Sequence, residues 1–283
     1  MTSSGMSKTN PMLVRNHYKV LSILGEGGFG KTFLVEDTHL PSRRKRVLKQ
    51  LKPVQTNAER EKLVRDRFER EATIIEKLGE AHDQIPRLYA HFEENGEFYL
   101  VEEWIEGLTL TQKVREEGPL REITVQKIMA DVLPAIDFVH SQKIVHRDIK
   151  PDNIVLRSRD KQPVLIDFGA VKESIRTEML SSSAQSTPSI VVGTPGYMPM
   201  EQMAGRPVYA SDIYSLGMTA IFLLTGQQPH EFESDPQTGL LEWRSHAPKV
   251  STEFTTFLDR ATSVSPQSRF ASVQEMQSAL QQL

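Results

Sequence analysis

The most constraining feature of this chain is residues 146–169, which read HRDIKPDNIVLRSRDKQPVLIDFG. This stretch places two acids, a lysine and an asparagine close together in the sequence. Asp148 can receive the proton of an attacking alcohol, and Lys150 can hold a phosphate oxygen. Asn153 and Asp167 offer the hard oxygen ligands that magnesium prefers. The segment therefore predicts phosphoryl transfer to a hydroxyl group.

Composition narrows the class of protein further. The chain has 283 residues, of which 38% are hydrophobic and 25% charged, enough to bury a core in one large or two modest lobes. A net charge of -3 gives no electrostatic reason to bind nucleic acid. The basic run 43–46 follows Pro41 and Ser42 and predicts a solvated hairpin turn. The absence of cysteine excludes a disulfide framework and fits a reducing compartment, so we expect a cytoplasmic protein.

No targeting or membrane-spanning segment is predicted in this sequence. The opening ten residues lack the apolar core of a signal peptide, and residues 1–16 are expected to be a disordered leader. The longest apolar stretch, 213–224, is shorter than the roughly 20 residues that cross a membrane. It predicts a buried helix instead.

Residues 17–103 predict an antiparallel sheet of five strands with one helix, Ala58 to Leu78. Glu71 falls within the apolar stripe of that helix, where a carboxylate is costly unless it meets a cation. Alternation along the strand 47–51 points Lys49 inward as well. The pattern therefore suggests a Lys49–Glu71 ion pair, whereas two snorkelling surface side chains would explain neither position.

Residues 104–283 predict a mainly helical lobe. Helices are expected at 122–142, 212–225, 252–261 and 273–283. The biased stretch 181–189 predicts a mobile loop, and Asp160 is expected to be a solvated turn residue in a hydrophilic hairpin. The fold class is therefore α+β, with a sheet-rich lobe before a helical one.

A glycine-rich segment, Gly25 to Gly30, lies between two strand patterns. Its backbone amides could approach phosphates closely. Such a motif is weak evidence alone, because it also marks dinucleotide folds and plain turns. A strand follows it here rather than a helix, which disfavours a dinucleotide site.

Taken in order, these motifs resemble the protein kinase family over about residues 18–283. The resemblance rests on the glycine loop, Val47-Leu48-Lys49, Glu71, His146-Arg147-Asp148, Asn153, Asp167-Phe168-Gly169, a degenerate Pro199-Met200-Glu201 and Asp212. It implies a two-lobed fold, with lobes 17–103 and 104–283, that uses ATP and magnesium.

The resemblance also implies a role for each motif residue. Lys49 would contact the α and β phosphates, Glu71 would hold Lys49, Asp148 would orient or deprotonate the acceptor, Lys150 would steady the γ-phosphate, and Asn153 with Asp167 would bind magnesium. The nucleotide would contact Leu24, Gly25, Glu26, Gly27, Gly28, Phe29, Gly30, Lys31, Thr32, Val47, Lys49, Glu103 and Ile105. Structural or regulatory roles fall to Glu71, His146, Arg147, Phe168, Gly169, Thr194, Glu201, Asp212 and Arg269. Glu201 should pair with Arg269, Asp212 should brace the catalytic loop, and His146 should pack beneath Phe168.

Short sequence motifs near Asp148 indicate the substrate class. Lys150 two residues after Asp148, with the segment 193–197, is similar to serine/threonine kinases. The sequences of the glycine loop and of residues 197–202 are similar to those of bacterial, particularly cyanobacterial, members of the family. The acceptor is therefore expected to be a serine or threonine of a protein.

Charge suggests regulation by phosphorylation. In the family, the positions of Arg147, Lys172 and Arg67 converge beside the catalytic loop, and three gathered cations call for an anion. Candidate phosphosites are Ser181, Ser182, Ser183, Ser186, Thr187 and Ser189. Autophosphorylation would bring two copies together in a transient dimer. The alternative is a serine-rich flexible linker.

Three residues depart from the family pattern. Thr32 stands where a valine usually covers the adenine, Met200 replaces a proline, and Glu102 occupies the usually apolar gatekeeper position. Alternation points Glu102 inward, where it would bond a polar group behind the adenine, unless the strand register is shifted by one residue.

The sequence thus predicts a signalling serine/threonine protein kinase whose partners are ATP and a protein substrate. Two alternatives stay open. A pseudokinase scaffold would need a lost lysine, aspartate or magnesium ligand, and a small-molecule phosphotransferase would lack the substrate platform at 193–201.

Overall fold

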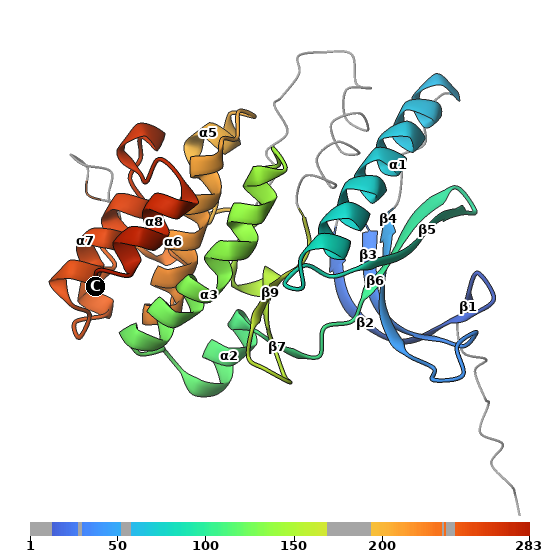
Figure 1. The fold of residues 1–283 in the computed structure, drawn as a ribbon, viewed down its shortest axis with the longest axis horizontal. Coiled ribbons are helices and arrows are strands. Elements are labelled where there is room, and N and C mark those ends of the chain that lie inside the picture. Colours follow the sequence, from blue (N-terminus) through green and yellow to red (C-terminus); the bar gives the residue numbers. More distant parts are fainter. Residues whose placement is uncertain (1–12, 28–29, 52–57, 169–193, 234, 236–240) are drawn as a thin grey trace, which may run out of the picture. The chain divides into compact units, whose positions relative to one another are not determined.

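The computed structural model describes residues 13–27, 30–51, 58–168, 194–233, 235 and 241–283. In the first helix, side chains are described at Arg65, Phe68, Glu69 and from Ala72 onward. The chain divides into two compact units (Figure 1). Met1–Gln55 and Arg87–Trp104 form the sheet unit, and Thr56–Pro86 with Ile105–Leu283 form the helical unit.

The sheet unit is an antiparallel sheet with strand order β1-β2-β3-β4-β6-β5. Its strands are β1 (Leu13–Val14), β2 (Tyr18–Gly27), β3 (Gly30–Asp37), β4 (Lys45–Leu51), β5 (Leu88–Glu94) and β6 (Glu97–Glu103). The β5–β6 turn has positive φ at Asn95 and Gly96, as tight hairpins require.

The sheet has six strands rather than the predicted five. The additional strand is β1, in which Leu13 pairs with Lys19 and Val14 with Tyr18. Val14 is 4% exposed, so burial of an apolar side chain holds this short strand in place. The predicted disordered leader, 1–16, was therefore wrong for residues 13–16, which form β1 and the turn after it, and residues 1–12 lie outside the described part of the chain.

The basic run also differs from the predicted solvated turn at one position. Arg46 is 6% exposed, and its guanidinium carbon lies 3.6 Å from the ring centroid of Tyr89. Arg43, Arg44 and Lys45 are exposed as expected. A planar guanidinium can stack on an aromatic face while it is buried, which a turn prediction does not anticipate.

The helical unit contains the predicted helices with small shifts at their ends. Its α-helices are α1 (Ala58–Ala81), α2 (Leu110–Glu117), α3 (Glu122–Ser141), α5 (Met200–Met203), α6 (Tyr209–Thr225), α7 (Thr252–Ala261) and α8 (Val273–Leu280). Its strands are β7 (Gly107–Thr109), β8 (Ile154–Arg157) and β9 (Pro163–Leu165), and short 3-10 turns lie at 151–153, 229–231, 244–246 and 266–268. Helix α1 belongs to this unit, whereas the sequence grouped it with the sheet. None of the described helices is long and apolar enough to span a membrane.

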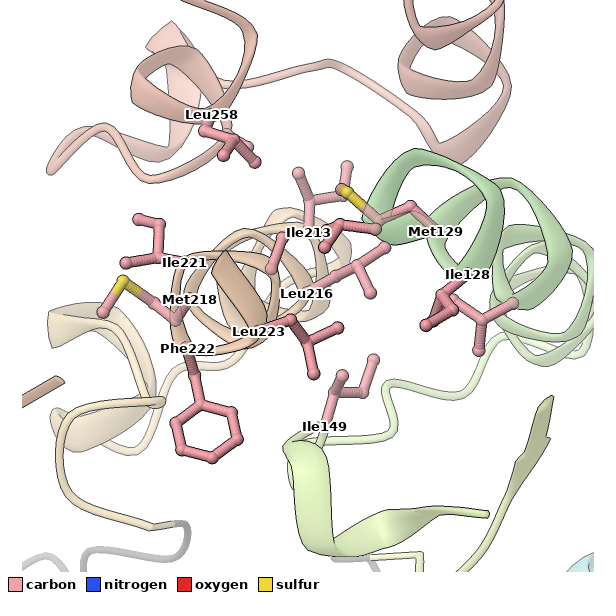
Figure 2. Close-up of a cluster of buried hydrophobic side chains, with 14 of the residues drawn as sticks. Ile128, Met129, Ile149, Ile213, Leu216, Met218, Ile221, Phe222, Leu223 and Leu258 are labelled. Atoms are coloured by element: carbon pink, nitrogen blue, oxygen red, sulfur yellow. The ribbon is translucent and has the colours of Figure 1, made fainter. Parts of the chain in front are cut away.

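Helix α6 forms the centre of the helical core (Figure 2). Ile213, Leu216, Ile221 and Leu223 are each about 1% exposed or less. The helix ends at Gly226, whose φ of 71° suits glycine, and its N–H donates to the carbonyl of Phe222. The prediction of a buried helix at 213–224 is confirmed.

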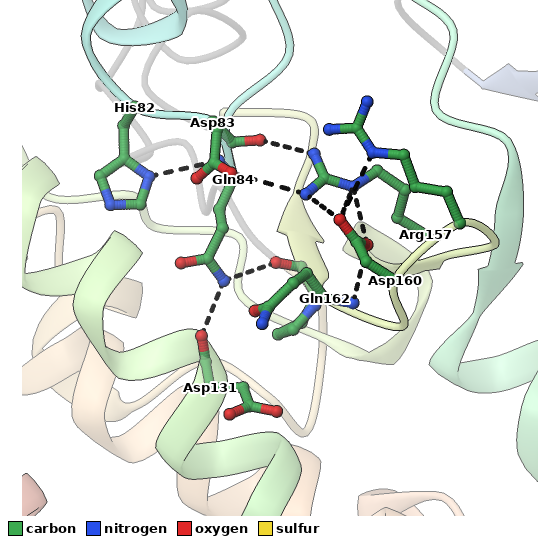
Figure 3. A network of polar contacts seen from close by, with 9 residues as sticks. His82, Asp83, Gln84, Asp131, Arg157, Asp160 and Gln162 are labelled. Carbon is green, nitrogen blue, oxygen red and sulfur yellow. Dashed lines mark hydrogen bonds and ion pairs between the residues drawn. The ribbon is translucent and has the colours of Figure 1, made fainter.

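The end of α1 is tied to the β8–β9 hairpin by a polar network (Figure 3). Gln84 Nε2 donates to the carbonyls of Asp131 and Pro163, both at 2.7 Å. Arg157 donates from Nη1 to the carbonyl of Asp83 at 3.0 Å and from Nη2 to Asp160 Oδ2 at 2.7 Å. Asp160 is an exposed residue of the turn 158–160, as predicted, and its carboxylate in addition accepts hydrogen bonds from the buried Arg157.

Candidate functional site

In the helical unit, a buried carboxylate accepts hydrogen bonds from the backbone of the candidate catalytic loop. Asp212 is fully buried, and its Oδ2 and Oδ1 accept hydrogen bonds from the backbone N–H groups of His146 at 2.8 Å and Arg147 at 2.9 Å. Asp212 Oδ2 also lies 2.8 Å from His140 Nε2. Gln202 donates from Nε2 to the carbonyl of Arg147 at 2.6 Å. These contacts fix the backbone immediately before Asp148.

Three described residues of the segment 146–169 have a left-handed backbone, Lys161 in the β8–β9 turn and two beside the candidate site. Arg147 has φ of 69° and Asp167 has φ of 64°. A non-glycine residue rarely adopts this conformation, and such strain is typical of functional sites. The His146 and Phe168 rings lie with centroids 4.5 Å apart, and His146 Nδ1 accepts the backbone N–H of Asp148 at 3.3 Å. The predicted packing of these two rings is present.

The polar side chains of the loop converge on Asp148, which is 8% exposed. Lys150 donates from Nζ to Thr194 Oγ1 at 2.6 Å and lies 3.4 Å from Asp148 Oδ1. The Thr194 hydroxyl in turn donates to Asp148 Oδ1 at 3.3 Å. Asp148 thus presents a carboxylate oxygen beside a lysine ammonium and a threonine hydroxyl. This arrangement can accept a proton while it holds an anionic group nearby.

Asn153 and Asp167 fit the donor set for magnesium. Asn153 donates from Nδ2 to both the carbonyl and Oδ2 of Asp148, each at 2.8 Å, so its amide oxygen remains as an acceptor. The backbone N–H of Ile166 donates to the carbonyl of Asn153 at 2.9 Å, which brings Asp167 next to this loop. Magnesium commonly uses one or two protein oxygens and completes its shell with water and phosphate. Among the residues that the structure describes, no group of three or more His, Cys, Asp or Glu forms a separate metal site.

The predicted Glu201–Arg269 contact is also present. Arg269 Nη1 lies 2.6 Å from Glu201 Oε1, and Arg269 Nη2 lies 3.2 Å from Oε2. Burial raises the pKa of Glu201, but hydrogen bonds from Arg269 and Ser211 outweigh it and lower the pKa below its ordinary value of 4.5. The carboxylate therefore stays charged inside the helical unit.

In the sheet unit, Lys49 lies on the face of β4 opposite the apolar cluster that contains Leu48. It pairs across the sheet with Thr32 on one side and Leu100 on the other. Its Nζ donates to Glu102 Oε1 at 2.8 Å and Oε2 at 2.7 Å. Glu102, at the gatekeeper position, is thus an acid that contacts Lys49 in the described part of the chain. The side chain of Glu71 lies outside the described residues, so the predicted Lys49–Glu71 pair stays a prediction.

Glu102 is 5% exposed and pairs with Val47 across β4–β6. The alternative of a strand register shifted by one residue was therefore wrong. The polar group that Glu102 contacts is the ammonium group of Lys49, which the alternation along β4 also predicts to face inward.

The glycine turn joins β2 to β3, with Gly27 paired to Gly30 and Gly25 to Thr32. At Gly30, a Cβ atom would lie 1.8 Å from the Gln50 carbonyl oxygen, so only glycine fits there. Glu26 and Lys31 form an ion pair across the hairpin at 2.8 Å. Gly28 and Phe29 lie outside the described residues. Leu24, the remaining predicted contact on β2, is 44% exposed.

The two predicted hinge residues belong to different units. Glu103 ends β6 in the sheet unit, and its N–H donates to the carbonyl of Arg87 at 2.8 Å. Ile105 begins the second segment of the helical unit, where it packs in a cluster with Val155 and Val164. Their contacts with adenine stay predictions.

Part of the predicted site lies outside the described residues. This applies to Gly169, to Lys172 and to every candidate phosphosite between Ser181 and Ser189, as well as to the side chain of Arg67. Sequence reasoning missed His140, Gln84 and Gln202. No periodicity marks Gln84 or Gln202, whereas the position of His140 in the last turn of a buried helix was a usable signal.

Comparisons with known proteins agree with this geometry. A family model described as "Protein kinase domain" matches residues 18–282. The chain is 53% identical to serine/threonine-protein kinase PknA of Nostoc sp. over 95% of this chain and 48% of that protein. It is 51% identical to serine/threonine-protein kinase C of Synechocystis sp., over 95% of this chain and 50% of that protein. The chain spans about half the length of these curated relatives.

A solved structure shares the same architecture. The PknI kinase domain of Mycobacterium tuberculosis is 27% identical to this chain, with a TM-score of 0.69. The comparison covers 95% of this chain and 97% of that one. The match of the family model to nearly the whole sequence carries the conclusion: the chain belongs to the protein kinase domain family.

Proposed function

We propose that this chain is a serine/threonine protein kinase that transfers the γ-phosphate of magnesium ATP to protein hydroxyls. The observation that supports this most directly is the convergence of Lys150, Thr194 and Asn153 on Asp148. The similarity to serine/threonine kinases of cyanobacteria supports the choice of acceptor.

The reaction assigns one task to each side chain. An acceptor hydroxyl oxygen attacks the γ-phosphorus, and the bond from that phosphorus to the β–γ bridging oxygen breaks. Asp148 takes the proton of the hydroxyl, and ADP leaves with the bridging electron pair. Lys150 neutralises charge on the transferred group. Magnesium, when bound, shields the phosphate charges, and Asn153 and Asp167 would hold it.

The residues of the sheet unit have roles in nucleotide binding in this proposal. The backbone of the glycine turn would cover the phosphates, and Lys49 would contact the α and β phosphates. Glu103 and Ile105 would offer backbone groups to adenine. Phosphorylation in the segment 181–189, in trans between two copies, would activate the enzyme. The cysteine-free sequence supports a cytoplasmic location.

A transfer assay with radiolabelled ATP tests the proposal. Wild type should label a generic protein substrate, Asp148→Ala should not, and Asp131→Ala should behave as wild type because the Asp131 carboxylate forms an exposed pair with Lys127. A nucleotide-binding scaffold predicts no transfer by wild type. A small-molecule kinase predicts ATP turnover with no labelled protein.

Regulation is tested separately. Mass spectrometry after incubation with ATP should find phosphate on the segment 181–189. Mixing wild type with Asp148→Ala should label the inactive copy if the reaction occurs in trans. Undiminished activity of a variant with alanine at all six hydroxyl positions would contradict the regulatory role.

A further inference from the structure

The gatekeeper Glu102 makes a bidentate contact with Lys49 inside the sheet unit. The distances from Lys49 Nζ to the two carboxylate oxygens are 2.8 and 2.7 Å, and the two side chains are 15% and 6% exposed. Two of the three hydrogens on the ammonium group are thereby directed at one carboxylate. Position 102 thus carries an acid where the family pattern leads us to expect an apolar side chain.

Strand register shows the direction in which this contact draws Lys49. The glycine turn lies beside Leu51, which pairs with Gly30, whereas Glu102 pairs with Val47. These pairs lie on opposite sides of Lys49, two residues away in each direction along β4, or about 6 to 7 Å. The Lys49 side chain therefore leans toward the Glu102 end of the sheet and away from the glycine turn.

Burial makes this contact costly to exchange. A carboxylate that is removed from water needs a cation or hydrogen-bond donors. A phosphate that takes the ammonium from Glu102 leaves that charge with a poorer partner.

We propose that Glu102 is a positioning residue that competes with the phosphates of the nucleotide for Lys49, and so weakens binding of ATP and ADP relative to adenosine. This inference rests on the proposed function, because it takes the ligand of Lys49 to be a nucleotide phosphate. Beyond that function, it states that the residue at position 102 sets how much the phosphate groups contribute to nucleotide affinity.

Direct binding measurements with and without magnesium test the competition. Glu102→Gln keeps the shape of the side chain and removes its charge, and Glu102→Met fills the same space with an apolar side chain. Both variants should bind ATP and ADP about fivefold or more tightly than wild type, the range of an ordinary coupling between two sites. Adenosine should bind all three proteins alike, because it has no phosphate to compete for Lys49.

A second set of variants, made in a protein that lacks Lys49, tests whether the effect of Glu102 on ATP affinity depends on that lysine. In Lys49→Met, the change Glu102→Gln should no longer alter ATP affinity. Glu106→Gln is the matched control, because it removes one carboxylate from an exposed position four residues away and should leave every affinity unchanged. Thermal melting should show that all variants fold.

The inference is overturned if Glu102→Gln and Glu102→Met bind ATP no more tightly than wild type, or if adenosine gains as much as ATP. It is also overturned if the effect persists without Lys49. Failure of wild type to bind ATP at all would instead refute the proposed function. The two failures are therefore distinguishable.

Discussion

The guanidinium group of Arg269 and the carboxylate of Glu201 form a two-pronged ion pair inside the helical unit, with N–O distances of 2.6 and 3.2 Å. Arg269 is 2% exposed and also donates to the backbone carbonyls of Ser263, Val264 and Ala210. One side chain therefore joins the α5 region to the loop after α7. A lysine could satisfy only part of this set.

We predict that Arg269→Lys and Arg269→Met both destabilise the helical unit, Met by about 3 kcal/mol or more because Glu201 is left without its cation. Lysine should cost less, since it keeps the charge. Urea denaturation followed by circular dichroism measures both. The control is Arg244→Met, which removes an exposed pair with Asp259 and should change stability by less than about 1 kcal/mol. Equal stability of Arg269→Met and wild type would contradict the prediction.

Acid should weaken the same pair. The pKa of Glu201 is lowered on folding, although burial alone would raise it, because Arg269 and Ser211 donate to the carboxylate. A lowered folded-state pKa contributes stability above the ordinary value of 4.5, and this contribution is lost as the pH falls through the lowered value. Denaturation at pH values from 7 to 3 should therefore show a steeper acid loss for wild type than for Glu201→Gln. Parallel curves would show that Glu201 does not contribute.

Gln84 offers a test of the network between α1 and the β8–β9 hairpin. Its amide nitrogen donates to two backbone carbonyls, so Gln84→Glu would direct a carboxylate at two acceptors. We expect a loss of about 2 to 4 kcal/mol in the free energy of unfolding. Gln84→Met loses the same hydrogen bonds without adding charge and should cost less. The prediction fails if Glu is tolerated better than Met at this position.

The pKa of Asp160 reports on its contact with Arg157. Hydrogen bonds from Arg157 are the main cause that lowers this pKa well below its ordinary value of 3.8. NMR titration of the Asp160 carboxyl should find a strongly lowered pKa in wild type and a rise toward 3.8 in Arg157→Gln. Arg159→Gln is the control, because Arg159 lies 3.4 Å from the same carboxylate and is exposed. It should move the pKa less than Arg157→Gln does.

Thr194 should matter to the proposed reaction through its hydroxyl. It accepts a hydrogen bond from Lys150 and donates one to Asp148, so it orders the two charged groups. We expect Thr194→Ala to lower kcat about 10- to 100-fold with little change in KM for ATP, while Thr194→Ser keeps most of the activity. Steady-state kinetics with a protein substrate measures this. A serine variant as impaired as the alanine variant would assign the effect to the methyl group instead.

Several elements could be predicted because their local pattern has one solution. The unbroken apolar run at 213–224 has to be buried, and α6 is. Strict alternation placed Lys49 and Glu102 on the inner face of their strands. Motif order predicted the Glu201–Arg269 contact across 68 residues, since the resemblance supplied a partner that no periodicity could identify.

Other features depended on contacts that the pattern of a single segment does not specify. The strand Leu13–Val14 exists because β2 offers it an edge, and Arg46 is buried because Tyr89 lies beside it. Tyr89 is distant from Arg46 in sequence, and although Tyr18 follows Val14 by only four residues, no periodicity in so short a segment marks the pairing. The turn pattern correctly predicted that Asp160 is exposed, but it carries no information about Arg157, three residues earlier, which donates to its carboxylate.

The sequence by itself indicated which side chains would carry the proposed chemistry and which charges had to face inward, because motif spacing and strand alternation are properties of the chain alone. Only the tertiary structure decided which partner each inward charge meets. Lys49 meets Glu102 because antiparallel pairing of β4 with β6 sets Val47 opposite Glu102, so that the acid lies diagonally from the lysine on the same face. The distance between the two side chains is set by the hydrogen-bond register of two strands that are distant in sequence, and not by the pattern within either strand.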